Sequence, residues 1–184
     1  MLETSLSICS KGAKGKQINN YLIIKMLGVG QYGKVYKAED QQSFEIRAIK
    51  AIERKRLKRI GGGEDPKVHE IQVLKKMCHR HVVRLHEVID DPQNSKIFLV
   101  MDYLPGGTIA DKIAASENGL DLVLVKKYFR QLVSALHYCH EVVNISHRDV
   151  KPENMLLDRD GDLILCDFGV SQFFNSENDI LKGT

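Results

Sequence analysis

Residues 27–36 read LGVGQYGKVY, which places three glycines, Gly28, Gly30 and Gly33, close together. Glycines at this density let backbone amides approach phosphate groups, because no side chain stands in the way. The spacing G-x-G-x-x-G matches a Rossmann fingerprint. Gly28 to Lys34 also match a Walker A loop, until Val35 stands where serine or threonine is required. The neighbouring sequence must decide what kind of loop this is.

The segments on both sides of the glycines have the pattern of β-strands. YLIIKM before them and VYKAED after them contain many residues that favour strands. Further along, SFEIRAIKAI alternates apolar and polar residues, as a half-buried strand does. A Rossmann or Walker A loop opens a helix at its last glycine, and no amphipathic pattern follows Gly33. We interpret the stretch as a loop between two strands, which excludes both alternatives.

The wider sequence predicts an α+β protein in three parts. Five strands and one helix, the helix within EDPKVHEIQVLKKM, precede LPGG at 104–107. A long helix over 121–141 follows, and then SHRDVKPENMLLDRDGDLILCDFGVS, which has the pattern loop, strand, turn, strand, loop. We expect a flexible leader over residues 1–20, a mainly β lobe over 21–104 and a mainly helical lobe over 105–184.

Composition limits the classes of partner. The 184 residues are 43% hydrophobic and 28% charged, which is typical of a soluble globular protein. A net charge of +3 is too small to indicate nucleic acid or a membrane surface, and no apolar run approaches the ~18 residues of a membrane span. The scattered cysteines fit a reducing compartment. We therefore expect a cytoplasmic location, with the nucleus as the alternative, and neither a nucleic-acid nor a membrane partner.

Several side chains suit phosphoryl transfer from a nucleoside triphosphate, which depends on positioning and charge neutralisation. Lys50 ends the strand IRAIK and would reach the α- and β-phosphates, and Glu70 in the following helix is spaced to pair with it. In HRDVKPEN, at 147–154, Asp149 would orient the attacking hydroxyl and Lys151 would neutralise the γ-phosphate.

Two further residues have the oxygen donors that Mg²⁺ prefers. Asn154 closes the same motif with an amide, and Asp167 begins the sequence DFG thirteen residues later. Taken singly, each of these residues would more often be a surface ion pair, a loop acid or a turn former. Their joint presence in one order makes the phosphoryl-transfer interpretation much stronger than any single motif does.

These motifs resemble those of eukaryotic protein kinases. The matching patterns are G-x-G-x-x-G-x-V at 28–35, A-I-K at 48–50, the helix glutamate, H-R-D-x-K-x-x-N at 147–154 and D-F-G at 167–169. The resemblance covers about residues 21–184 and, through Lys151, is of the serine/threonine type. It implies a bilobal fold with a five-stranded antiparallel amino-terminal lobe and one helix. It also implies ATP and Mg²⁺ as cofactors and a protein hydroxyl as acceptor.

The resemblance also implies the nucleotide contacts. Met101 would lie at the back of the adenine pocket, and the backbones of Asp102 and Leu104 would bind the base. The full set of implied nucleotide-binding positions is Leu27, Gly28, Val29, Gly30, Gly33, Val35, Ala48, Lys50, Met101, Asp102, Leu104, Glu153 and Leu156. Asn154 and Asp167 are the implied metal ligands.

A closer resemblance links three stretches to one subgroup. KRLKRIGGGEDPKVHEIQVLKKM, EVIDDPQNSKIFLVMDY and DFGVSQFF are similar to the calcium/calmodulin-dependent protein kinase kinases and the liver kinase B type. These kinases switch on AMP-activated protein kinase. The resemblance implies a protein substrate, with a threonine in the activation loop of another kinase as one candidate.

The chain ends at Thr184, whereas the family pattern continues with an A-P-E-like segment and further helices. We therefore expect an incomplete helical lobe and uncovered apolar surface on the helix at 121–141. The face that we predict to be buried carries Leu122, Val125, Phe129, Leu132 and Leu136. Two functions follow as alternatives: an active serine/threonine kinase, or an ATP-binding, catalytically impaired module that regulates a partner. The sequence leaves the oligomeric state open.

Overall fold

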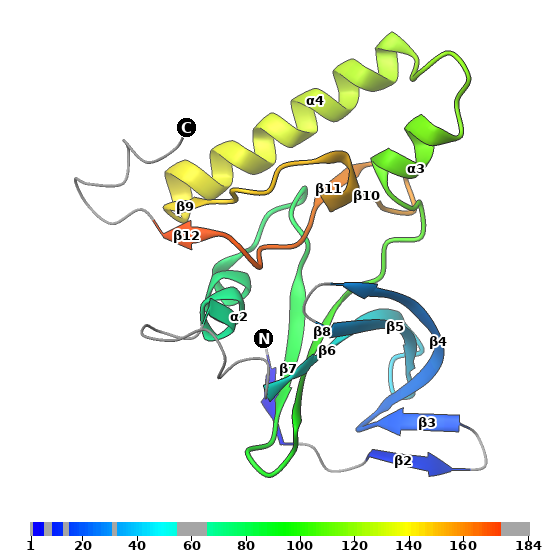
Figure 1. The fold of residues 1–184 in the computed structure, drawn as a ribbon, viewed down its shortest axis with the longest axis vertical. Helices are drawn as coiled ribbons and strands as arrows, with labels where there is room; N and C mark the ends of the chain where they lie inside the picture. The colour runs from blue at the N-terminus through cyan, green and yellow to red at the C-terminus, as the bar shows by residue number, and fades with distance from the viewer. Residues whose placement is uncertain (1, 6–8, 13–14, 31–32, 55–65, 174–184) are drawn as a thin grey trace. The chain divides into compact units, whose positions relative to one another are not determined.

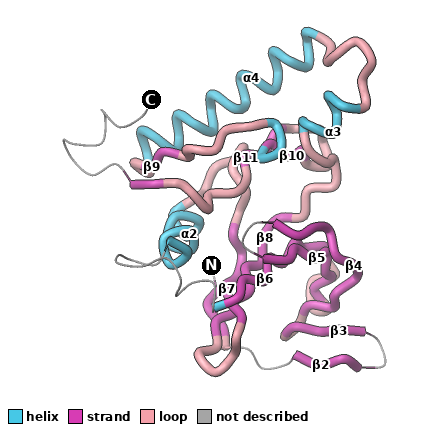
Figure 2. Tube along the Cα trace, viewed as in Figure 1, coloured by secondary structure: helices cyan, strands magenta, loops and turns pink. Residues whose placement is uncertain are grey.

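A computed structural model describes residues 2–5, 9–12, 15–30, 33–54 and 66–173. The chain divides into two compact units. Unit 1 comprises Met1–Asp65 and Arg84–Tyr103, and unit 2 comprises Pro66–Val83 and Leu104–Thr184. Figure 2 shows that strands dominate unit 1, whereas the three labelled helices belong to unit 2. The helix expected in the amino-terminal lobe thus groups with the second unit.

Unit 1 is one eight-stranded sheet in the order β1-β7-β8-β6-β5-β4-β3-β2. The five predicted strands form its antiparallel centre (Figure 1): β4 (Tyr21–Gly30), β5 (Gly33–Asp40), β6 (Ile46–Glu53), β7 (Leu85–Asp90) and β8 (Lys96–Asp102). The glycine-rich segment therefore joins two paired strands, as the sequence predicts.

The prediction of a flexible leader over residues 1–20 is wrong for the described part of that segment. It contributes β1 (Leu2–Thr4), β2 (Cys9–Gly12) and β3 (Gly15–Ile18), which extend both edges of the sheet. The Thr4 hydroxyl donates to Glu87, and the side chain of Ile18 is fully buried. The polar composition of residues 1–20 does not indicate strands, because an edge strand is held by backbone pairing, which does not depend on apolar side chains.

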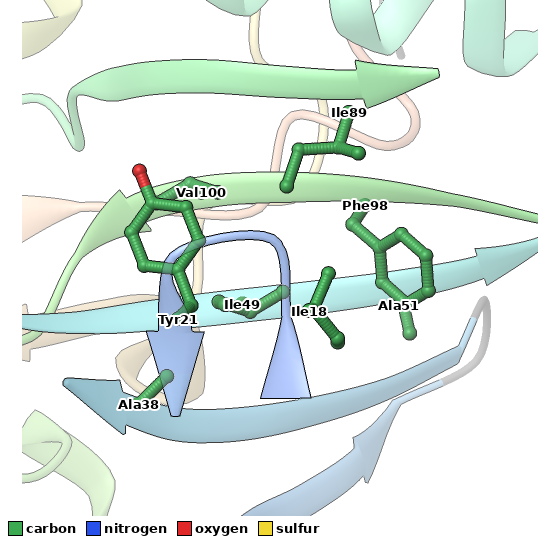
Figure 3. Packing of buried hydrophobic residues seen from close by; sticks show 8 residues of the cluster. All are labelled: Ile18, Tyr21, Ala38, Ile49, Ala51, Ile89, Phe98 and Val100. Carbon is green, nitrogen blue, oxygen red and sulfur yellow. The ribbon is translucent and has the colours of Figure 1, made fainter. Parts of the chain in front are cut away.

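Alternate residues of the central strands form the core of unit 1. Ile49 and Ala51 of β6 pack with Phe98 and Val100 of β8, as Figure 3 shows. The full cluster consists of Ile18, Tyr21, Ala38, Ile49, Ala51, Ile89, Phe98 and Val100. Because side chains alternate across a strand, the residues between these core positions point to the opposite face of the sheet.

A buried polar pair lies at the edge of this core. The Tyr21 hydroxyl donates to Glu87 Oε2 over 2.6 Å. Burial, followed by the hydrogen bond to Glu87 and its charge, raises the pKa of Tyr21 above the usual range. The phenol therefore stays protonated at neutral pH, and its proton satisfies a carboxylate that would be costly to bury alone.

Unit 2 contains α2 (Pro66–Lys76), α3 (Ile109–Ala114), α4 (Leu122–His137) and the π-helical turn η1 (Tyr138–Val142). Short elements follow: β9 (Ile145–Ser146), η2 (Pro152–Asn154), β10 (Met155–Leu157), β11 (Leu163–Leu165) and β12 (Gln172–Phe173). β10 pairs with β11, and β12 pairs with β9. Within the described ranges, none of the helices is long and apolar enough to cross a membrane.

Our prediction of which face of α4 is buried is partly wrong. Leu122 and Phe129 are each 65% exposed, whereas Tyr128 and Ala135 are buried. A polar contact anchors the same helix, because Gln131 Nε2 donates to Asp162 Oδ1 over 2.8 Å. Within the described residues, α4 thus carries several exposed apolar side chains.

Candidate functional site

The glycine-rich loop begins in β4 and ends in β5, and Gln31 and Tyr32 at its tip lie outside the described residues. Gly28 pairs with Val35 across the two strands. Gly33 lies against β6 so closely that a Cβ atom there would be 2.0 Å from the Ala51 carbonyl oxygen. At Gly33, therefore, packing within the sheet demands glycine independently of any ligand.

We expect Gly33→Ala to lower the free energy of unfolding by about 1–3 kcal/mol, because the new methyl group overlaps a carbonyl oxygen that cannot move alone. Gly28→Ala is the matched control, since a Cβ there meets nothing within 4 Å. Denaturant unfolding of both variants measures the difference. Equal stability of the two variants would show that the close approach at Gly33 is unimportant.

Lys50 lies on β6, on the face opposite the core, and its side chain is only 9% exposed. Its register partners are Val35 on β5 and Leu99 on β8, while Ala48 pairs with Met101. The predicted adenine contacts Val35, Ala48 and Met101 thus share one sheet face with the predicted phosphate lysine. In this arrangement the apolar side chains could contact the base of a nucleotide, and the lysine could contact its phosphates.

The remaining predicted positions of unit 1 lie on β4 and at the end of β8, whereas Glu70 belongs to unit 2. Leu27 and Val29 are on β4 and are 42% and 65% exposed. Gly30 ends β4, and Asp102 ends β8. Glu70 belongs to α2, but its side chain is outside the described residues. The pairing of Glu70 with Lys50 therefore stays a prediction.

In unit 2, three predicted residues meet around the Asp149 carboxylate. Lys151 Nζ lies 2.8 Å from Asp149 Oδ2, and Asn154 Nδ2 donates to the same oxygen over 2.9 Å. Asn154 Nδ2 also donates to the Asp149 backbone carbonyl over 2.8 Å. The hydrogen bond from Lys151 lowers the pKa of Asp149, and the same bond raises the pKa of Lys151. Both groups are therefore charged at neutral pH.

A buried histidine connects this loop to the DFG segment. The Asp149 amide donates to His147 Nδ1 over 3.2 Å, so His147 Nε2 carries the proton and donates to the Cys166 carbonyl at 2.9 Å. Burial lowers the pKa of His147, which keeps the imidazole neutral. Its ring also meets the buried Phe168 ring edge-on, with the centroids 4.7 Å apart.

The donor set of Asn154 and Asp167 fits a magnesium ion. Pairing of Met155 with Leu165 places their neighbours close together, and the Cys166 amide donates to the Asn154 carbonyl over 2.8 Å. Because Asn154 Nδ2 faces two oxygens of Asp149, its Oδ1 is the amide atom that could ligate a cation. Asp167 adds an exposed carboxylate. Amide and carboxylate oxygens are suitable Mg²⁺ ligands.

Two backbone conformations mark the same region as special. Arg148 has φ 66° and Asp167 has φ 60°, in the left-handed region that non-glycine residues rarely adopt. Each costs of order 1 kcal/mol and persists only where surrounding contacts enforce it. Arg148 directly precedes Asp149, the residue predicted to orient the hydroxyl. Asp167 is itself the predicted metal ligand.

The last predicted nucleotide contacts, Glu153, Leu156 and Leu104, all belong to unit 2. Glu153 is exposed in η2, and Leu156 is half-buried on β10. Leu104, also half-buried, opens the second stretch of unit 2.

Three side chains that no sequence motif indicates contact β11 and the turn before it. Lys127 Nζ lies 2.8 Å from Asp162, Gln131 Oε1 accepts from the Leu163 amide, and His81 Nδ1 contacts the Leu163 carbonyl at 3.0 Å. These side chains lie far from the motifs in sequence and have no motif of their own. They could be found only once the strand pairing was known.

Comparison with known proteins gives consistent matches. A family model described as protein kinase domain matches residues 21–184. A probable serine/threonine-protein kinase of Dictyostelium discoideum is 40% identical, with 89% of this chain and 24% of the relative covered. CBL-interacting serine/threonine-protein kinase 20 of Arabidopsis thaliana is 39% identical, with 87% and 35% covered. Serine/threonine-protein kinase ssp1 of Schizosaccharomyces pombe is 41% identical, with 90% and 26% covered. The chain thus spans between 24% and 35% of the length of these three relatives.

Proposed function

Because this chain belongs to the protein kinase family, we propose that it transfers the γ-phosphate of ATP to a serine or threonine hydroxyl of a protein. The observation that carries the proposal is the contact of Lys151 and Asn154 with the Asp149 carboxylate. A charged acid held between a cation and an amide can accept a hydrogen bond from an incoming hydroxyl.

The roles of the unit 2 residues follow from their contacts. Asp149 orients the acceptor hydroxyl and takes its proton as the new P–O bond forms and the bond from the γ-phosphorus to the bridging oxygen breaks, which releases ADP. Lys151, already beside Asp149, offsets the negative charge of the transferring phosphoryl group. Asn154 and Asp167 would hold Mg²⁺, which supplies neutralisation of phosphate charge when bound. His147 keeps the loop and the DFG segment in register through its two ring nitrogens.

Unit 1 supplies the binding of the nucleotide in this proposal. Lys50 would contact the α- and β-phosphates, and Ala48, Val35 and Met101 on the same sheet face would pack against adenine. The amides of the glycine-rich loop would cover the phosphates.

The substrate is proposed more narrowly from the sequence stretches that resemble kinases acting upstream of AMP-activated protein kinase. On that basis we expect a threonine in an activation loop of another kinase to be a good acceptor. The relatives described above carry the names of CBL-interacting and other serine/threonine kinases. The narrower substrate therefore depends on the sequence stretches alone, and threonine peptides of activation-loop sequence test it against serine versions.

The alternative function is a regulatory module that binds ATP without efficient catalysis. The observation that favours it is the apolar surface of α4, where Phe129 borders a cavity of about 220 Å³ that is also lined by Ile109 and Ile113 of α3. Such a surface suits contact with another protein.

Incubation with labelled ATP, Mg²⁺ and a generic serine/threonine peptide separates the two proposals. Label on the peptide supports the kinase, and ATP binding without transfer supports the regulatory module. A chain that neither binds ATP nor transfers phosphate would contradict both. Binding is measured in parallel by the rise in melting temperature that Mg²⁺ and ATP produce.

A further inference from the structure

His86 occupies a β-bulge at the start of β7. The register of β7 with β8 pairs Leu85 with Met101 and Glu87 with Val100, so His86 is an extra residue between consecutive pairs. A bulge breaks the alternation of a strand and redirects the side chain of the inserted residue. Because bulges are frequent next to functional sites, the contacts of the His86 imidazole can indicate a function for it.

The redirected imidazole meets Asp102, the last residue of β8. His86 Nε2 donates to Asp102 Oδ1 over 2.6 Å, and both side chains are largely shielded from solvent, being 24% and 35% exposed. The second carboxylate oxygen, Oδ2, accepts from the Arg84 amide over 3.3 Å. The Asp102 amide in turn donates to the Arg84 carbonyl over 3.2 Å. Asp102 is thus held through both its side chain and its backbone.

The surrounding charges favour an ionised Asp102. Burial opposes ionisation, but the hydrogen bond and charge of His86, the Arg84 amide and the charge of Arg47 together lower the pKa of Asp102. Arg47 is the register partner of Asp102 on β6. A charged carboxylate accepts stronger hydrogen bonds than a neutral acid does, so the contact with His86 is a firm restraint.

We propose that His86 is a positioning residue for nucleotide recognition, which fixes the backbone of Asp102 so that it can bind the adenine base. This inference depends on the proposed function, in which the backbones of Asp102 and Leu104 bind the base. His86 itself touches no nucleotide in this account. It acts through the Asp102 carboxylate, whose orientation sets that of the peptide group at the end of β8.

The test compares the affinities of wild-type chain, His86→Leu and His86→Gln for ADP and GDP in the presence of Mg²⁺. We expect His86→Leu to weaken ADP binding by about three- to tenfold, because a charge-assisted restraint is lost. GDP binding should change by less than about twofold, since guanine has a carbonyl oxygen where adenine has its 6-amino donor and gains little from the same backbone geometry. Gln offers an amide donor and should restore most of the ADP affinity.

Controls separate positioning from general damage. His137→Leu alters an exposed histidine of α4 and should leave both affinities unchanged. Should His86→Leu fail to fold, Asp102→Asn removes the charge and disrupts one of the two carboxylate contacts, and it should weaken ADP binding more than GDP binding. Unchanged ADP affinity, or an equal loss for ADP and GDP, would overturn the role of His86. A wild-type chain that binds no ADP would instead refute the proposed function.

Discussion

Replacing Asp149 with asparagine is expected to slow phosphate transfer by about 10²–10⁴-fold, with little change in the affinity for ATP and Mg²⁺. The amide preserves the shape of the side chain but cannot accept a proton from the acceptor hydroxyl. It also loses the charge that holds Lys151 at 2.8 Å. Transfer of labelled phosphate to a peptide measures the rate, and the ATP-induced shift in melting temperature measures binding.

Asp160→Asn is the matched control for this experiment, because Asp160 is an exposed carboxylate in the turn between β10 and β11. Its rate should equal that of the wild-type chain. If Asp149→Asn retained transfer within a few-fold of wild type, Asp149 would not be the group that activates the hydroxyl. The proposed mechanism would then be wrong at its central residue.

Replacing Lys50 with methionine is expected to lower phosphate transfer by about 10²-fold or more, because a cation that contacts the phosphates is removed from a site shielded from water. Methionine fills a similar volume without the charge, and the free energy of unfolding of the variant is measured beside its transfer rate because Lys50 is only 9% exposed. The two measurements together distinguish a lost phosphate contact from a damaged sheet.

Lys25→Met provides the comparison, since Lys25 lies exposed on β4 of the same sheet. It should preserve both stability and transfer. Equal transfer rates for Lys50→Met and Lys25→Met would show that Lys50 has no role at the phosphates. A loss of stability confined to Lys50→Met would indicate a structural role instead.

The sequence predicts the centre of the fold well, because the central strands combine apolar alternation with strong turn signals. The α+β class and the glycine-rich loop between β4 and β5 are confirmed. The amino-terminal strands were missed, because β1 is held by pairing with the distant strand β7 and β2 by backbone pairing with its neighbour β3. Their own composition gives no sign of that pairing.

The orientation of α4 was predicted only in part. A helical stripe of Leu122, Val125 and Phe129 has the period of a buried face, yet these side chains are exposed. Lys127 and Gln131 of the same helix bind the turn that ends at Asp162. Hydrophobic periodicity does not detect such polar anchors, since long polar side chains can hold a loop while apolar ones face outward.

The contacts around Asp149 were predictable, because Asp149, Lys151 and Asn154 lie within one short motif. An acid, a base and an amide so close in sequence can readily form hydrogen bonds with one another. The neutral state of His147 was not predictable, because it follows from burial and from the Cys166 carbonyl. The bulge at His86 was equally hidden, since it is a property of the register between β7 and β8.

The central claim is that Lys50 and Lys151 each contact the phosphates of bound ATP. Labelling with an acyl-phosphate derivative of ATP tests it most directly, because a lysine amine beside the phosphates attacks the acyl carbon and releases ATP. We predict acylated peptides that contain Lys50 and Lys151, one from each unit, with labelling of both suppressed by excess ATP and Lys25 unmodified. Labelling of neither lysine, or labelling that excess ATP does not suppress, would contradict the account.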